Sequence, residues 1–313
     1  MKQSFTDIIQ CEHPIIMAPM FLVSNVEMIT EALAAGITGA IPALNYRTTE
    51  ELARAIDSIR EISNKPFGIN LIVNKSNVRY KSQLKVCIEK KVDFIITSLG
   101  SPRECIELAK PQGIPVFCDV IDLKYAKIVQ ELGATGVIAV GSGAGGHAGN
   151  LGSKDLVTTL NKELDILIIS AGGIATKKDV DQHLSFGADA VSVGTVFIAS
   201  DEAGVSKNYK QALVDYGAKD VVRTTKMSGS ALTVINTPYV QSIGTKATFL
   251  ERLMHKNKWL KKYIKMIIAI RGLKAIENAA NKATYKTVWV AGPVIEHIRA
   301  IRPVREIVQD LIK

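Results

Sequence analysis

Short apolar runs alternate with amphipathic segments along the first two thirds of the chain. The apolar runs occupy residues 14–19, 37–42, 67–73, 93–98, 114–120, 135–141, 166–172 and 189–194. Their near-continuous hydrophobicity is typical of parallel strands that are buried on both faces of a sheet. The segments between them carry apolar residues at three- and four-residue spacing, as in 50–62 and 123–133, and this spacing predicts amphipathic helices.

The number of strand–helix units distinguishes the two common parallel folds. Eight units in about 200 residues favour a closed barrel, because an open doubly wound sheet typically has about five or six strands. We therefore predict an α/β fold, a (β/α)8 TIM barrel, over residues 12 to about 216.

The alternating pattern ends after about residue 217. Residues 225–245 are rich in Gly, Ser, Thr and Pro and predict a loop, and a basic segment with helical character follows. The last stretch, 294–313, predicts a terminal helix with Pro303 at a helix start. We expect residues 1–220 and 291–313 to form the barrel with its terminal helix. Residues 221–290 are expected to form a helical lid or small subdomain over the barrel mouth, where such enzymes place their active sites.

The composition is that of a soluble globular protein, with 47% hydrophobic and 22% charged residues among 313. The first residues lack the basic and apolar regions of a secretory signal, and no run approaches the roughly 20 apolar residues that span a bilayer. We therefore expect a cytoplasmic protein without a transmembrane segment. The four cysteines form no CxxC pair and have no nearby histidine cluster, which favours buried structural thiols over a metal site.

The formal net charge of +9 is concentrated in one segment. Residues 251–286 contain ten Lys or Arg and only two Glu. An acidic protein partner, a membrane surface and a solvated helix face all remain possible, and the solvated face is the commonest. Nucleic acid is a poor fit, because few aromatic platforms, such as Trp259 and Tyr263, lie among these basic residues.

Two glycine-containing segments follow the last two predicted strands, at 171–176 and 194–197. Glycine lets the backbone approach an anion closely, and backbone N–H groups together with a helix N-terminus bind phosphate. Gly172, Gly173 and Gly194 could instead only form tight turns. Their position after strands seven and eight favours a phosphate site.

The segment 140–150, after the sixth predicted strand, contains five glycines and a single titratable side chain, His147. Such a loop can lie flat against a planar ring, with the imidazole over the reacting atom and Gly145 and Gly146 lining the substrate side. With an ordinary pKa near 6.5, a histidine can donate or accept a proton near neutral pH. We interpret His147 as catalytic and the other four histidines as structural.

Two weaker signals come from the first and third strands. Pro19 shapes a turn at the end of the first strand, and Met20 offers a polarizable surface to a flat cofactor. Asn70 can donate and accept hydrogen bonds at once, which suits the edge of a heterocycle or a phosphate.

Taken together, the segments PIIMAPM, FGINL, AGGHAG, ISAGGIAT, GADAVSVGTVFIAS and IRPVREIVQDL resemble the nitronate monooxygenase family, formerly 2-nitropropane dioxygenases. This family shares its FMN-dependent TIM barrel with FMN-dependent enoyl-acyl-carrier-protein reductases. The resemblance covers nearly the whole chain. One departure concerns the strand-six loop, where Val140 and Gly143 stand in place of the family's usual Gln and Glu.

The resemblance implies roles for individual residues. Contacts with the isoalloxazine and ribityl chain of FMN are implied for Ala18, Pro19, Met20 and Asn70. Contacts with the FMN phosphate are implied for Ala171, Gly172, Gly173, Gly194 and Thr195. His147 matches the family's catalytic histidine, which takes a proton from the carbon next to a nitro group or protonates a substrate.

Three hypotheses follow for the function. The first is an FMN oxidoreductase that oxidises alkyl nitronates with O2 to carbonyl compounds and nitrite. The second is an NAD(P)H-dependent reductase of an enoyl thioester or a quinone, with an acidic acyl carrier protein docking at the basic segment. The third is a flavin-binding barrel that acts mainly by binding a partner.

Overall fold

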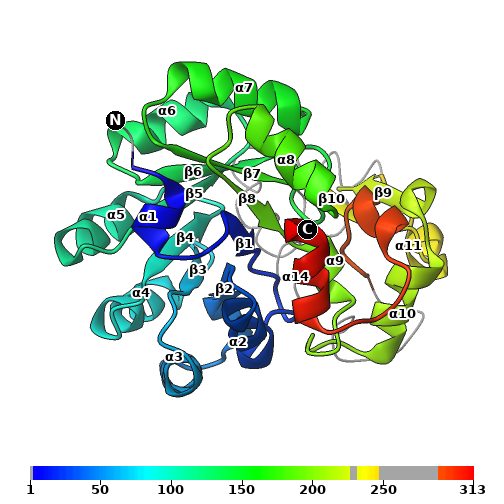
Figure 1. The fold of residues 1–313 in the computed structure, drawn as a ribbon, viewed down its shortest axis with the longest axis horizontal. Coiled ribbons are helices and arrows are strands. Elements are labelled where there is room, and N and C mark those ends of the chain that lie inside the picture. Colours follow the sequence, from blue (N-terminus) through cyan, green and yellow to red (C-terminus); the bar gives the residue numbers. More distant parts are fainter. Residues whose placement is uncertain (1–2, 226–230, 247–287) are drawn as a thin grey trace.

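The computed structural model describes residues 3–225, 231–246 and 288–313. Eight parallel strands close into a barrel in chain order, and β8 pairs back onto β1 (Figure 1). The strands are β1 Ile15–Met17, β2 Thr38–Pro42, β3 Gly68–Ile72, β4 Phe94–Ser98, β5 Val116–Val120, β6 Gly136–Val140, β7 Leu167–Ala171 and β8 Ala190–Val193. Each strand lies inside one of the eight apolar runs in the sequence, so the predicted (β/α)8 barrel is confirmed.

Helices cover the outside of the barrel (Figure 1). Helix α1 (Phe5–Ile9) precedes β1 and packs at the amino end of the barrel. The helices that follow the strands as far as residue 215 are α2 Val26–Ala34, α3 Thr49–Ile62, α4 Tyr80–Glu89, α5 Arg103–Ala109, α6 Leu123–Glu131, α7 Ser153–Glu163, α8 Lys177–Ser185, α9 Thr195–Ile198 and α10 Lys207–Asp215. Side chains fix several helix starts: Thr48 caps α3, Asp122 caps α6, and Thr176 with Asp179 forms a capping box on α8. The amphipathic helices predicted at 50–62 and 123–133 are confirmed as α3 and α6.

The barrel interior is filled by apolar side chains at its amino end. Phe94 and Phe117 meet edge to face, with ring centroids 5.8 Å apart, and Phe5 from α1 packs on Phe117 at 6.0 Å. Gly68 on β3 leaves the space that the Phe94 ring occupies, because a Cβ at Gly68 would fall within that ring. This packing closes the amino end and leaves the opposite end of the barrel for a site.

The prediction of a loop over 225–245 is wrong in part. Strand β10 (Leu232–Ile235) pairs antiparallel with β9 (Val221–Thr224), and helix α11 (Pro238–Ile243) follows. The hairpin has a small core of its own, in which Leu232 and Val234 pack with Val288. A four-residue strand between turn-forming residues gives a weak sequence signal, and part of its apolar partner set is distant in the chain.

The terminal segment is α-helical only after Pro303. Helix α14 (Val304–Ile312) starts directly behind this proline, as predicted, whereas a 3₁₀ helix over Pro293–His297 and extended chain precede it. Proline disfavours a helical conformation in the residue before it, which separates the two parts. Helix α14 packs against α2 and α8, and so fills the position on the barrel wall that follows β8.

The basic segment 251–286, and with it most of the predicted lid, lies outside the described residues. Among the residues that the structure describes, no helix is both long and apolar enough to cross a membrane. The division into a barrel and a lid segment stays a prediction.

We expect Gly68→Ala to lower the free energy of unfolding by about 1–3 kcal/mol, because the added methyl group must displace the Phe94 ring in a closed core. Urea unfolding followed by circular dichroism measures this change. Gly152→Ala is the matched control: its φ is −62°, and the nearest atom to its Cβ would be Asp155 Oδ2 at 3.9 Å. Equal destabilisation by both variants would contradict the steric explanation.

Candidate active site

The carboxyl ends of the eight strands form the mouth of the barrel, and the inward side chains at this level differ from those below. Because side chains alternate along a strand, the inward positions of β4 run Phe94, Ile96, Ser98, and those of β5 run Phe117, Asp119. Ile96 and Phe117 are fully buried, whereas Ser98 and Asp119 are only partly buried. The mouth is therefore polar on this side and open to solvent, while the interior beneath it is closed and apolar.

A chain of hydrogen bonds joins three strands at the mouth. Asn70 on β3 donates through Nδ2 to the Ile96 carbonyl at 3.2 Å and to Ser98 Oγ at 2.7 Å, and Ser98 Oγ donates to Asp119 Oδ2 at 2.5 Å. Burial raises the pKa of Asp119 to about 6, against the opposing effect of the Ser98 hydrogen bond. Asn70 was a predicted site residue; Ser98 and Asp119 were missed. The signal for Asp119 was a lone carboxylate within the apolar run at 114–120.

The loops after β1 and β8 come together, as the sequence predicted. The Ala18 N–H donates to the Val193 carbonyl at 2.8 Å. A Cβ on Gly194 would lie 3.5 Å from Ala18 Cβ and 3.6 Å from Met20 Sδ. Ala18, Met20 and Gly194 therefore face one another at the mouth, with Pro19 in the same turn. Thr195 also lies here.

The Thr195 hydroxyl is engaged by the C-terminal part of the chain. Its Oγ1 accepts a hydrogen bond from the Gly292 N–H at 3.0 Å. The predicted phosphate contact of Thr195 thus shares its hydroxyl with a structural hydrogen bond, which ties α9 to the segment before the 3₁₀ helix.

The two glycines after β7 differ in their surroundings. Both have positive φ, +97° at Gly172 and +85° at Gly173, which glycine adopts readily. A Cβ at Gly172 would lie 2.5 Å from the Ala144 N, so this glycine allows the strand-six loop to pack directly against the β7 loop. Apart from its own chain neighbours, no described residue has an atom within 4 Å of a Cβ at Gly173. Gly172 therefore has a packing role, whereas Gly173 faces open space on this side.

The same close packing involves Gly143, which stands where the family usually has Glu. A Cβ there would lie 3.2 Å from the Gly173 N, which is tighter than an ordinary contact. Glycine at 143 thus suits the close approach of the two loops in this chain. No structural reason is found for Val140, which packs against the barrel interior.

The loop that carries His147 is held by the β9–β10 hairpin. Gly146 and Thr233 exchange two backbone hydrogen bonds, of 3.1 and 2.7 Å. Arg223 on β9 donates to the Ala148 carbonyl at 2.9 Å and to Asn150 Oδ1 at 3.0 Å. Sequence reasoning missed this support because it interpreted the hairpin as a loop.

His147 itself is exposed at the surface of the mouth, yet protein atoms crowd around it and lower its pKa from the ordinary value of 6.5. Because the lowered pKa keeps the imidazole neutral at pH 7, His147 is suited to accept a proton. Gly145 and Gly146 directly precede it in the same loop.

The remaining histidine and cysteine expectations concern residues away from the mouth. His183 is buried, with Nδ1 2.8 Å from Ser170 Oγ, in the layer between β7 and α8. All four cysteines are free; Cys87, Cys105 and Cys118 are buried, as predicted, and Cys11 is half-buried. His255 lies outside the described residues.

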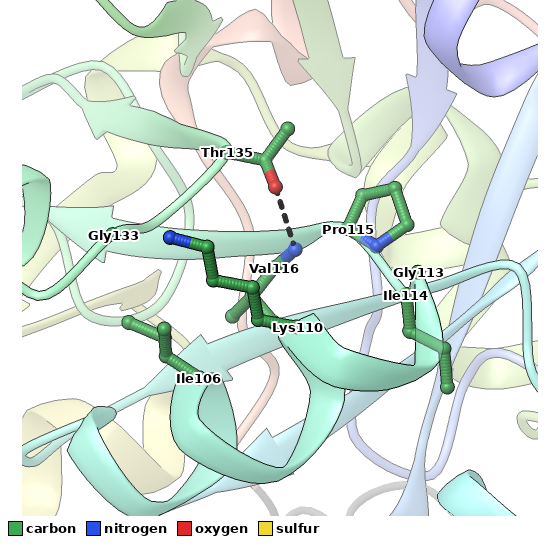
Figure 2. A pocket seen from close by; sticks show the side chains of 8 residues that line it. All are labelled: Ile106, Lys110, Gly113, Ile114, Pro115, Val116, Gly133 and Thr135. Carbon is green, nitrogen blue, oxygen red and sulfur yellow. Dashed lines mark hydrogen bonds between the residues drawn. The ribbon is translucent and has the colours of Figure 1, made fainter.

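A cleft of about 220 Å³ lies at the opposite, amino end of β5 and β6 (Figure 2). Thr135 Oγ1 accepts a hydrogen bond from the Val116 N–H there, drawn as a dashed line, and Ile106 contributes an apolar wall. Lys110 supplies the cleft's charge. Since the Thr135 hydroxyl already bonds to the Val116 N–H and no other titratable side chain lines this cleft among the described residues, the mouth remains the better candidate.

We expect Arg223→Ala to loosen the His147 loop without unfolding the barrel. Loss of the two hydrogen bonds should cost about 1 kcal/mol locally and speed the exchange of the amide hydrogens of residues 145–150 several-fold. Hydrogen–deuterium exchange with mass spectrometry measures this. Arg305→Ala, on the exposed face of α14, should leave the exchange unchanged; unaltered exchange in both variants would contradict the assigned role of Arg223.

Comparisons with known proteins agree with this fold over most of the chain. FabK from Thermotoga maritima superposes with a TM-score of 0.86 and 28% identity, over 99% of this chain and 95% of that one. A (3aS,4S,5R,7aS)-5-hydroxy-7a-methyl-1-oxo-octahydro-1H-indene-4-carboxyl-CoA dehydrogenase from Rhodococcus jostii is 27% identical, over 78% of this chain and 68% of that protein. A probable nitronate monooxygenase from Staphylococcus saprophyticus is 25% identical, over 76% of this chain and 79% of that protein.

The sequence profile named "Nitronate monooxygenase" matches residues 2–80 and 74–313, which is nearly the whole chain. The match includes the loops after β1, β3, β6, β7 and β8 that meet at the barrel mouth. The chain belongs to the nitronate monooxygenase family of flavin oxidoreductases.

Proposed function

We propose that this protein is an FMN-dependent oxidoreductase that oxidises alkyl nitronates with O2 to carbonyl compounds and nitrite. The observation that carries the proposal is His147, a neutral imidazole held at the barrel mouth by the β9–β10 hairpin. A base in this position can take the proton from the carbon next to a nitro group and so generate the nitronate from a nitroalkane. Membership of the family supports the same assignment.

The residues at the mouth fit FMN. Ser98 and Asp119 are polar and partly exposed, Gly173 faces open space among the described residues, and the Oδ1 atom of the buried Asn70 has no hydrogen-bond partner among them. When bound, FMN supplies the redox chemistry by exchanging electrons with the substrate and with O2. We propose that its ring and ribityl chain contact Ala18, Pro19, Met20 and Asn70. We propose that its phosphate is held by Ala171, Gly172, Gly173, Gly194 and Thr195.

We propose that Gly145 and Gly146, which directly precede His147, line the substrate side through their backbone. A Cβ at Gly145 would lie 2.9 Å from the Gly292 N and one at Gly146 3.4 Å from Val290 Cγ1, so both glycines also let the loop pack against residues 290–292. The protein then has three tasks: to hold the substrate against the cofactor, to exclude water from the contact, and to manage one proton at the His147 ring.

A visible absorption spectrum of the purified protein, with identification of the released cofactor, tests the FMN assignment. The expected preparation is yellow and releases FMN. Oxygen uptake and nitrite formation with a nitronate, without reduced nicotinamide, test the reaction. A colourless protein that FMN does not reconstitute would refute the proposal.

The acyl-thioester hypothesis has a specific observation in its favour, namely the 27% identity to a dehydrogenase whose name specifies a carboxyl-CoA substrate. A neutral His147 also suits removal of a proton next to a thioester carbonyl. Anaerobic stopped-flow mixing with NADH, NADPH and a CoA thioester separates the two functions. Rapid flavin bleaching by a nicotinamide, followed by turnover of crotonyl-CoA, would replace the nitronate assignment with a reductase.

We expect His147→Asn to lower kcat/KM for a neutral nitroalkane by about 10²- to 10⁴-fold, the usual worth of a general base, and to affect the preformed nitronate much less. For the wild type, kcat/KM with the nitroalkane should rise with pH through the His147 pKa, which lies below 6.5, because only the neutral imidazole accepts a proton. The variant should lose this inflection. Equal losses with nitroalkane and nitronate would exclude His147 as the base.

A further inference from the structure

Asp119 is an unusual residue for its position. It points inward from β5, directly above the buried Phe117, in a run that is otherwise apolar or outward-facing. Its Oδ2 accepts from Ser98, and its Oδ1 has no hydrogen-bond partner among the described residues. Desolvation raises the pKa of the Asp119 carboxyl to about 6. Burial of a carboxyl group with an unpaired oxygen costs free energy, and this cost points to a role for Asp119.

The hydrogen bonds fix the direction of each group in the chain from Asn70 to Asp119. The Ile96 carbonyl can only accept, so the Asn70 atom that meets it at 3.2 Å must be the amide nitrogen. The second amide hydrogen goes to Ser98 Oγ at 2.7 Å. Ser98 has one hydrogen, which it gives to Asp119. The amide oxygen of Asn70 is thereby turned away from these partners.

We propose that Ser98 and Asp119 are positioning residues, which lock the Asn70 amide with its oxygen presented to a hydrogen-bond donor on the cofactor, so that cofactor affinity depends on the ionisation of Asp119. The proposal rests on the FMN site proposed above. It adds a pH-sensitive support beneath that site, on the β3–β5 side of the mouth.

The two charge states of Asp119 act differently on Ser98. An ionised carboxylate only accepts hydrogen bonds, so the Ser98 hydroxyl must donate to it and keeps its lone pairs for Asn70 Nδ2. A protonated carboxyl can donate to Ser98 Oγ, which then accepts from two donors, while the Ser98 hydrogen no longer has to point at Asp119 and can turn toward the Asn70 amide. The lock on the amide is therefore strongest when Asp119 is ionised.

Titratable groups on the neighbouring elements include Cys118, Tyr125 and His147. The charged side chains of the covering helices α5 and α6 are exposed, apart from the half-buried Glu104: Arg103, Glu107, Asp122, Lys124, Lys127 and Glu131. Burial raises the pKa of Cys118 to about 12 and raises that of Tyr125, so both stay neutral near pH 6. His147 lies on the β6 loop, and its pKa is lowered. Since both groups titrate on the acidic side of pH 7, variants must separate them.

The test is the dissociation constant of FMN for the apoprotein, measured by quenching of flavin fluorescence between pH 5 and 8. For the wild type we expect binding to weaken by about three- to tenfold as pH falls through 6, which is the worth of one hydrogen bond. Asp119→Asn should lose this part of the pH dependence and keep only the part that comes from the FMN phosphate, whose second pKa is about 6. Ser98→Ala should bind weakly at all pH values, and Ser98→Thr, which keeps the hydroxyl, should restore the wild-type profile.

Asp57→Asn is the matched control, because it makes the same change at an exposed ion pair with Lys90 on the barrel wall. It should keep the wild-type profile. Persistence of the full wild-type pH dependence in Asp119→Asn would assign it to the FMN phosphate or to His147 and overturn the proposal. Tighter binding at low pH would also overturn it, since that sign indicates direct repulsion between the carboxylate and the anionic cofactor.

A second measurement needs no cofactor. Carbon-13 NMR of the aspartate carboxyl groups in the apoprotein should show one resonance that titrates near pH 6, is absent in Asp119→Asn, and moves to higher pH in Ser98→Ala, which loses the hydrogen bond that favours ionisation. This titration together with no FMN binding at any pH would refute the proposed cofactor. FMN binding with the same profile in wild type and Asp119→Asn would refute the relay alone.

Discussion

The site depends on direct contact between backbone segments of three loops. The strand-six loop lies against the β7 loop at Gly172 and against the segment before the 3₁₀ helix, where a Cβ on Gly145 would lie 2.9 Å from the Gly292 N. Its third contact is the pair of hydrogen bonds between Gly146 and Thr233. The contacts at Gly172 and Gly145 leave no room for a side chain, and the contact at Gly146 consists of backbone hydrogen bonds. These three contacts therefore fix the path of the loop through its backbone. His147 is positioned by this path.

The two ends of the barrel differ in the side chains that point inward. At the amino end, Phe5, Phe94 and Phe117 fill the interior and exclude water. At the carboxyl end, inward Ser98 and Asp119 are partly open to solvent. A closed barrel permits this arrangement because the strand pairing satisfies the backbone hydrogen bonds throughout, so the last inward residue on each strand is free to vary.

The eight strands could be predicted because burial on both faces makes each strand a continuous apolar run, and this signal is local in the sequence. His147 and the glycine loops were found for a similar reason, since an unusual local density of glycine marks them. The β9–β10 hairpin was missed because its core depends on Val288, far along the chain. The link from Ser98 to Asp119 was missed because strand register, which no single segment reveals, brings the two side chains together.

Burial acts on the two titratable groups of the mouth in the same physical sense. Desolvation disfavours the charged form of each, so it lowers the pKa of the His147 imidazole and raises that of the Asp119 carboxyl. As the pH rises through the pKa of Asp119, the carboxyl group becomes an anion that only accepts hydrogen bonds. As the pH rises through the pKa of His147, the imidazole loses its positive charge. Both titrations therefore change the charge of the mouth in the same direction, toward a more negative value.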